Sequence, residues 1–183
     1  MVTQNYLALR LVRLTPTNEW FNNKTDLSFV FLQSGKGKYV STSVTRQVVG
    51  GDVLVLNGTS GGKLCISNGG DLAFCCFSVP LEHLFPLFEI NEISLLPDIM
   101  ENFNGTKLYP ASTPLAQKCH QLIADAPPPF DLDHRSQLLR IVASILTMEF
   151  RSGYFQRGGG IRIEAHKIQV FEKLSAERSE ERL

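Results

Sequence analysis

Histidines and carboxylates are the residues of this sequence that could bind a catalytic metal ion. The histidines are His83, His120, His134 and His166. No two of them lie at the close spacing that ligands of one metal ion usually show. A metal site also needs carboxylates that converge with the imidazoles, and the segment 40–47, which precedes the glycine pair Gly50-Gly51, contains neither residue type. The sequence therefore predicts no metal ion and no cofactor.

Nucleophilic chemistry has no better support in the sequence. It contains no G-x-S-x-G motif, no cysteine–histidine signature and no phosphate-binding loop. The cysteines are Cys65, Cys75, Cys76 and Cys119, without a C-x-x-C pair, which predicts reduced and mostly buried thiols. We interpret Glu82-His83 as a surface pair where the chain leaves a strand. No catalytic residue is predicted, and the chain is expected not to be an enzyme.

Composition narrows the class of protein further. The 183 residues, 43% of them hydrophobic, are enough for one large domain with its own core, or for a domain with an appendage. Eighteen basic and eighteen acidic residues give no net charge, whereas a free-standing nucleic-acid-binding domain usually has a basic excess. Arg10 and Arg13 interrupt the N-terminal apolar pattern, and no stretch approaches the roughly 20 apolar residues of a membrane span. A cytoplasmic protein is expected.

The first 110 residues are predicted to form a β-domain. Short β-rich runs, most of them apolar and one of mixed polarity (Lys38–Val44), recur at roughly ten-residue spacing between glycine turns, as in a sandwich or barrel. They include Leu27–Leu32, Lys38–Val44, Val53–Leu56 and Leu72–Val79. The last of these is apolar at nearly every position, which predicts a strand that is buried on both faces.

Residues 111–157 are predicted to be helical. Thr113-Pro114 is an N-cap followed by proline at the first helical position. A second helix is expected over 131–151, and its apolar positions cover so broad an arc that it has more than one surface to bury. We predict that one stripe packs on the β-domain and the other on a partner chain; the alternative is a core helix in a monomer. The predicted interface residues are Leu138, Ile141, Val142, Ile145 and Met148.

The remaining segment, 158–183, begins with three glycines that predict a flexible joint, followed by a charged helix. The sequence is thus divided into 1–110, 111–157 and 158–183.

Four motifs in this order carry a resemblance to a known family. They are Gly50–Asn57, a glycine turn and strand; Leu84–Phe88; Asp133–Arg140; and Ile168–Leu174. In this order they resemble the N-terminal regulatory half of an AraC/XylS-family transcriptional regulator. The resemblance implies a mainly β, α+β fold, in which a cupin-like double-stranded β-helix, or jelly-roll barrel, precedes a helical dimerisation segment.

The same resemblance implies partners. It implies a homodimer through the 131–151 helix and an unidentified small-molecule effector. Contact with DNA would be made only by a C-terminal helix-turn-helix half, which is expected to follow 158–183 and is absent from this chain.

A ligand pocket inside the barrel is predicted only loosely. Tyr39, Ser41 and Ser43 share one face of their strand, and the sequence leaves open which face points inward. Arg46 is either a contact for an anionic ligand or a solvated edge charge, and the apolar candidates are either pocket lining or core. The candidate set is Phe29, Phe31, Tyr39, Ser41, Ser43, Arg46, Phe74 and Cys76.

Two other interpretations remain open. One is a cupin enzyme of the isomerase or dioxygenase class, or a small-molecule-binding cupin without any connection to DNA. The other is a pure dimerisation module whose barrel is filled by side chains.

Overall fold

The computed structural model describes residues 7–22, 26–58, 61–67, 70–93, 106–125 and 132–156. The predictions for 158–183 lie outside these ranges. The chain divides into two compact units, Met1–Ile145 and Leu146–Leu183.

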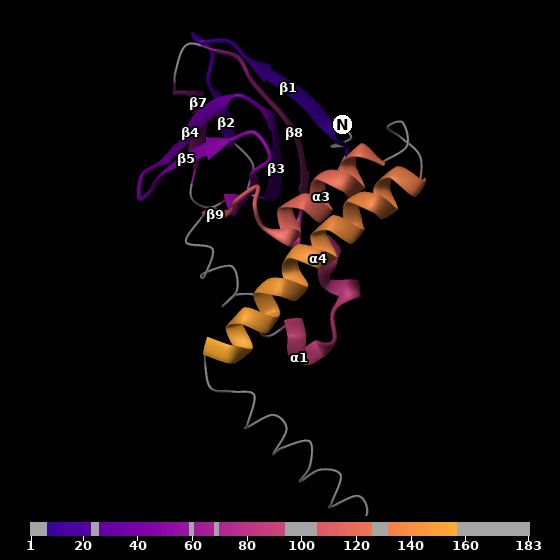
Figure 1. The fold of residues 1–183 in the computed structure, drawn as a ribbon. Helices are drawn as coiled ribbons and strands as arrows, with labels where there is room; N and C mark the ends of the chain where they lie inside the picture. The colour runs from indigo at the N-terminus through magenta and orange to yellow at the C-terminus, as the bar shows by residue number, and fades with distance from the viewer. Residues whose placement is uncertain are drawn as a thin grey trace, which may run out of the picture. The chain divides into compact units, whose positions relative to one another are not determined.

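The first unit is built on two antiparallel sheets (Figure 1). The first sheet has the order β1 (Arg10–Leu14), β8 (Leu72–Val79), β3 (Leu27–Ser34), β6 (Val53–Leu56) and β9 (Thr106–Tyr109). The second sheet has the order β2 (Trp20–Asn22), β7 (Gly62–Ile66), β4 (Lys36–Ser41) and β5 (Thr45–Val49). Strands that follow one another in the sequence are thus mostly not adjacent in a sheet, which is the arrangement of a jelly roll.

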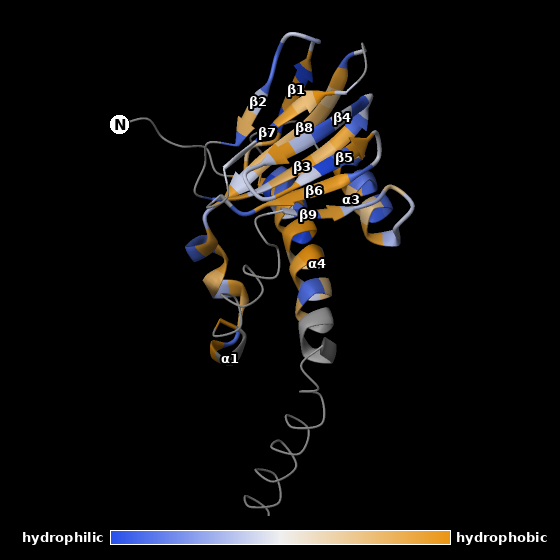
Figure 2. Ribbon diagram, turned by 90° about the vertical axis from the view of Figure 1, so that its left-hand side faces the viewer, coloured by the Kyte–Doolittle hydropathy of each residue, from blue (hydrophilic) through white to orange (hydrophobic). Residues whose placement is uncertain are grey.

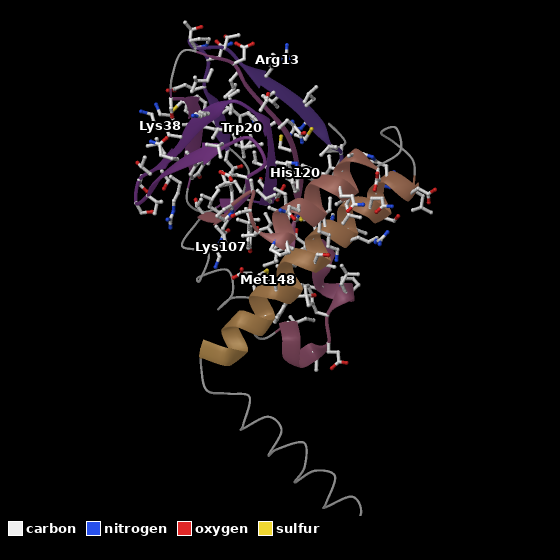
Figure 3. All side chains as sticks on the ribbon, in the orientation of Figure 1. Arg13, Trp20, Lys38, Lys107, His120 and Met148 are labelled. Carbon is white, nitrogen blue, oxygen red and sulfur yellow. The ribbon has the colours of Figure 1, made fainter. Side chains whose placement is uncertain are left out.

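The barrel interior is an apolar core between the two sheets. Its buried members come from both sheets: Leu14, Val30, Leu32, Tyr39, Val48, Leu54, Leu56, Leu64, Leu72, Phe74 and Cys76. Trp20 packs against this cluster, with its ring edge-on to Phe74 at a centroid distance of 5.5 Å, and Figure 3 shows it among the barrel strands. In the hydropathy colouring β6 is hydrophobic throughout, whereas β4 also carries hydrophilic positions (Figure 2).

The outer face of the first sheet is buried as well. Phe29 and Phe31 alternate with the inward Val30 and stack on Phe77 at centroid distances of 5.0 and 5.8 Å. The helix α3 (Pro114–Ala124) covers this face, since the His120 ring lies edge-on to Phe31 at 6.2 Å (Figure 3). The expectation that Leu72–Val79 is buried on both faces is confirmed, with Cys75 the one half-buried position in the strand.

The predicted start of α3 is also confirmed. Thr113 is the N-cap, its hydroxyl accepts a hydrogen bond from the Ala116 N–H at 3.3 Å, and Pro114 is the first helical residue. The helix α4 runs from Leu132 to Gln156, five residues beyond the predicted end at 151. Between β8 and β9 lie the 3₁₀ helix η2 (Leu81–Leu87) and the single turn α1 (Ile90–Ile93).

The glycine pair before β6 makes a tight turn that brings the chain back to β3. Gly51 has a φ of +92°, a backbone conformation that favours glycine. Its N–H donates to the Leu32 carbonyl oxygen at 2.7 Å, and the Gly50 N–H donates to the Gly35 carbonyl oxygen at 3.0 Å. The predicted turn and strand at Gly50–Asn57 therefore close one end of the β3–β6 pair.

Among the described helices, none has the length and apolar character that crossing a membrane would require.

Candidate ligand site

A row of hydroxyl side chains crosses the inner face of the first sheet at one end. Thr106 is paired with Leu56, Leu56 with Ser28, and Ser28 with Ser78, so these residues lie side by side on four adjacent strands. Ser28 has the same orientation as Val30 because side chains two residues apart on a strand share a face. Since Leu56 and Val30 belong to the barrel core, the hydroxyls of this row point inward.

A second row lies opposite, on the second sheet. Gly62 is paired with Asn22 on one side and with Ser41 on the other. The Ser28 hydroxyl donates to Asn22 Oδ1 at 3.2 Å, and the Ser28 and Ser78 hydroxyl oxygens are 2.9 Å apart. The two rows therefore meet across the barrel interior.

Tyr39 reaches into the same region from β4. A Cβ placed at Gly62 would overlap the Tyr39 Oη and Cζ atoms, so the phenol tip lies directly against the Gly62 backbone. Glycine is required here because any larger residue would occupy the space of the phenol. We call Asn22, Ser28, Tyr39, Ser78 and Thr106 the polar layer.

Three atoms of the polar layer are buried without a hydrogen-bond partner in the described structure: Asn22 Nδ2, Tyr39 Oη and Thr106 Oγ1. The three residues are 4%, 0% and 5% exposed. Buried polar groups are nearly always paired, and an orphaned one costs about 1–3 kcal/mol. The polar layer thus holds hydrogen-bonding capacity that the described protein groups do not use, as expected of a binding site.

The side chains of the polar layer offer hydrogen bonding, because all five are amide or hydroxyl groups. All four cysteines are free, as predicted, and burial raises the pKa of the Cys75 thiol and raises that of Cys119 to about 11. Both thiols are therefore protonated at neutral pH and are poor nucleophiles.

The described histidines lie on three different elements. His83 is exposed on η2, His120 lies on α3 and His134 on α4, while His166 is outside the described ranges. No group of three or more His, Cys, Asp or Glu residues within those ranges is arranged to hold a metal ion.

The predicted pocket residues do not come together at one point. Tyr39, Phe74 and Cys76 share the barrel core. Phe29 and Phe31 lie on the opposite face of the first sheet, under α3. The remaining three surround the β4–β5 turn: the Ser41 hydroxyl oxygen lies 3.3 Å from the Val44 carbonyl oxygen, and Ser43 and Arg46 are exposed.

Sequence reasoning missed four of the five residues in the polar layer, since only Tyr39 was a candidate. Two of the missed residues carried a signal, because Ser28 and Ser78 are hydroxyl residues within otherwise apolar strands. Asn22 and Thr106 carried none, as each stands in a short strand of mixed composition.

The predicted interface residues of α4 are largely buried within the single chain. Leu138, Ile141, Val142 and Ile145 are 0% exposed, whereas Met148 is 45% exposed. In this protomer the first four already contribute to its core. The residues of α4 that remain exposed include Ser136, Arg140, Ala143, Thr147 and Met148.

Two antiparallel sheets that close over an apolar core, followed by a helical segment, define a cupin-like barrel with appended helices, as the sequence resemblance implied. No protein-family model matches the sequence, and no curated protein matches it significantly. Solved structures nevertheless share the fold.

One of them is apo ToxT K231A from Vibrio cholerae, with a TM-score of 0.54 and 12% identity over 80% of this chain and 56% of that chain. Another is the AraC-like transcriptional activator CuxR, with a TM-score of 0.53 and 12% identity over 78% of this chain and 52% of that chain. The chain thus spans about half the length of these two proteins, whose fold it shares. A predicted oxalate decarboxylase from Thermotoga maritima is similar over 40% of this chain and 65% of its own, with 15% identity and a TM-score of 0.37.

Proposed function

We propose that this chain is the effector-sensing and dimerisation part of an AraC-type transcriptional regulator. The observation that carries the proposal is the extent of the likeness in fold. The ToxT structure covers 80% of this chain, which is more than the barrel alone provides, so the likeness includes helices that follow the barrel. In this proposal the chain binds a small molecule, forms a homodimer in the cytoplasm and catalyses no reaction.

DNA recognition in this proposal belongs to a separate helix-turn-helix half of the whole regulator. The 18 basic and 18 acidic residues of this chain leave no excess positive charge for contacts with phosphates. Pairing two chains would set the distance between two reading heads on paired DNA half-sites. A ligand that binds one arrangement of the pair more tightly would shift the equilibrium towards it.

The dimer in this proposal is formed through α4. Leu138 and Ile145 are fully buried within the protomer, so a partner helix would meet the exposed side of α4 instead. Arg140, Ala143 and Thr147 follow one another at helical spacing on that side. Small residues at the centre of such a surface would let two helices approach closely.

The test is the mass of the chain in solution together with a reporter assay. Sedimentation of the 20.4 kDa chain should give a dimer that dissociates when Ala143 is replaced by glutamate, while the control Gln117→Glu on the exposed side of α3 remains dimeric. Fused to a DNA-binding head that requires dimerisation, the wild-type chain and the Gln117→Glu control should repress a reporter gene, and Ala143→Glu should not. A monomer at all concentrations, with no repression, would overturn the proposal.

A further inference from the structure

We infer that Asn22 and Tyr39 bind an acceptor oxygen on a small uncharged ligand, inside the barrel beside Gly62. The inference rests on the proposed function and specifies the chemistry of the ligand that would be sensed. It is carried by two orphaned polar atoms that the strand register brings together.

The hydrogen-bond pattern of the layer shows what is left to bind. Each serine hydroxyl has one hydrogen to donate. Ser28 donates to Asn22 Oδ1, so the contact between the two serines is completed by the Ser78 hydroxyl donating to Ser28. This chain of bonds engages the Asn22 carbonyl oxygen and leaves the Asn22 N–H groups and the Tyr39 O–H unused. What these groups lack is an acceptor.

The strand register places both donors beside Gly62. Asn22 and Gly62 are directly paired on neighbouring strands, and paired Cα atoms on antiparallel strands lie about 4.5–5.5 Å apart. The Tyr39 hydroxyl lies against Gly62, on the interior face that Asn22 also faces. Thr106 is two strands from Ser28, roughly 10 Å away, and is not needed for this contact.

The charges around the layer favour an uncharged ligand. Burying an ion without a partner is costly, and the polar layer has no charged side chain. Lys63 follows Gly62, but it points to the opposite face of the strand and forms an ion pair with Glu19 at 2.8 Å. Arg46 lies on β5, is paired with Tyr39 of β4 and shares its face of the sheet, but it is exposed, and β4 separates β5 from the β7 strand that carries Gly62.

The rest of the ligand would be apolar. Leu56 lies within the first row, between Thr106 and Ser28, and Leu64 lies two residues after Gly62 on β7. Both are fully buried core residues, and Trp20 packs on the same core. A carbonyl, ether or alcohol oxygen on a small hydrocarbon body therefore matches both the donors and the surrounding surface.

The test is binding of three probes of similar size and different charge. The full chain is titrated with 2-butanone, butyrate and butylammonium, and the amide signals of Asn22 and Gly62 are followed by NMR. A five-atom ligand has a ceiling of about −7.5 kcal/mol, so its dissociation constant cannot fall below the order of micromolar. We expect saturable shifts with 2-butanone, and binding at least about tenfold weaker with either ion.

Three variants separate the contact from general effects on the fold. Tyr39→Phe removes one hydroxyl and should weaken binding of 2-butanone by about tenfold, the value of one hydrogen bond. The matched control is Tyr109→Phe, which makes the same change on the outer face of the first sheet and should bind like wild type. Gly62→Ala should also reduce binding, because its methyl group would take the place of the phenol tip.

Three results would overturn the inference. They are no saturable binding of 2-butanone, stronger binding of either ion, and equal binding by wild type and Tyr39→Phe. Ordered water alone in the layer would appear as the first of these. If binding fails while the chain still dimerises and represses, the ligand class is wrong and the regulator proposal stands. If binding succeeds while the chain is a monomer, the site stands and the regulator proposal fails.

Discussion

The carboxylate of Asp52 accepts a hydrogen bond of 2.9 Å from the backbone N–H of Ala111, a residue 59 positions later in the chain. Its other oxygen accepts one of 2.9 Å from the Val49 N–H. Asp52 is only 5% exposed, so the two bonds are shielded from water. One side chain thereby ties the glycine turn of the barrel to the segment that leads into α3.

We predict that Asp52→Asn lowers the free energy of unfolding by about 1–3 kcal/mol, because an amide nitrogen cannot accept the bond that the second carboxylate oxygen accepts. Urea denaturation of the two proteins measures this. Asp71→Asn, at an exposed position, should change stability by less than about 0.5 kcal/mol. Equal stability of wild type and Asp52→Asn would contradict the role assigned to the carboxylate.

For Tyr39 we expect removal of the hydroxyl to leave the ligand-free protein as stable as wild type, or slightly more stable. Tyr39→Phe removes an orphaned polar atom and keeps the ring in the core, whereas Tyr39→Leu also leaves a cavity and should cost about 2–4 kcal/mol. Thermal and urea unfolding of both variants decide the matter. A large loss of stability in Tyr39→Phe would mean that the hydroxyl has a partner in the folded protein.

The contact between Gly62 and Tyr39 predicts that mutations at the two positions are not additive. Gly62→Ala should destabilise the protein by about 1–3 kcal/mol through overpacking, because the new methyl group overlaps the phenol. Combined with Tyr39→Leu, the same substitution should cost less, because the smaller side chain frees the space. A double-mutant cycle measures the coupling, and additive effects would show that the two residues do not meet.

Substitutions in α4 should separate core residues from surface residues. Leu138→Ala is expected to cost about 2–5 kcal/mol, because Leu138 is 0% exposed within the protomer, and Leu138→Asp should unfold it. If Leu138 and Ile145 lay in a dimer interface, charged residues at these positions would yield a folded monomer. Because both are buried within the protomer, the same substitutions are expected to unfold it. Circular dichroism shows the difference; a folded monomeric Leu138→Asp variant would place Leu138 between chains.

The Cys119 thiol predicts a loss of stability at high pH. Burial raises its pKa from 9.0 to about 11 in the folded protein, so the unfolded chain loses this proton first as the pH rises. The stabilisation is complete below pH 9 and is lost progressively as the pH approaches 11. Urea denaturation across this range should show the decline, and Cys119→Ala should make it shallower. An identical decline in both proteins would argue against this linkage.

The sequence allowed prediction of the elements whose signals are local. The Gly50-Gly51 turn, the Thr113-Pro114 start of α3 and the doubly buried Leu72–Val79 strand each depend on residues next to one another. In each case backbone conformation or continuous apolar character specifies the structure without knowledge of what packs on it.

The polar layer could not be predicted from the sequence, for a physical reason. On β3 both Phe29 and Val30 are buried, one under α3 and one inside the barrel, so alternation gives no inward direction. The contact of Ser28 with Asn22 depends on the register of two different sheets. Likewise, the apolar arc of α4 predicts that Ile141 is buried, but it cannot distinguish burial within the chain from burial against a partner chain. The structure shows that Ile141 is buried within its own chain.

The order of the strands has a consequence for how the chain folds. Among the described strands, β4 and β5 are the only pair that follow one another in the chain and also lie side by side. Every other pairing joins distant segments, such as Arg10 with Cys76, and such non-local contacts slow folding to milliseconds or seconds. β7 must enter between β2 and β4 before Asn22 and Tyr39 meet at Gly62. The proposed ligand site therefore exists only once these distant segments have paired, and its occupancy would report that the barrel has closed.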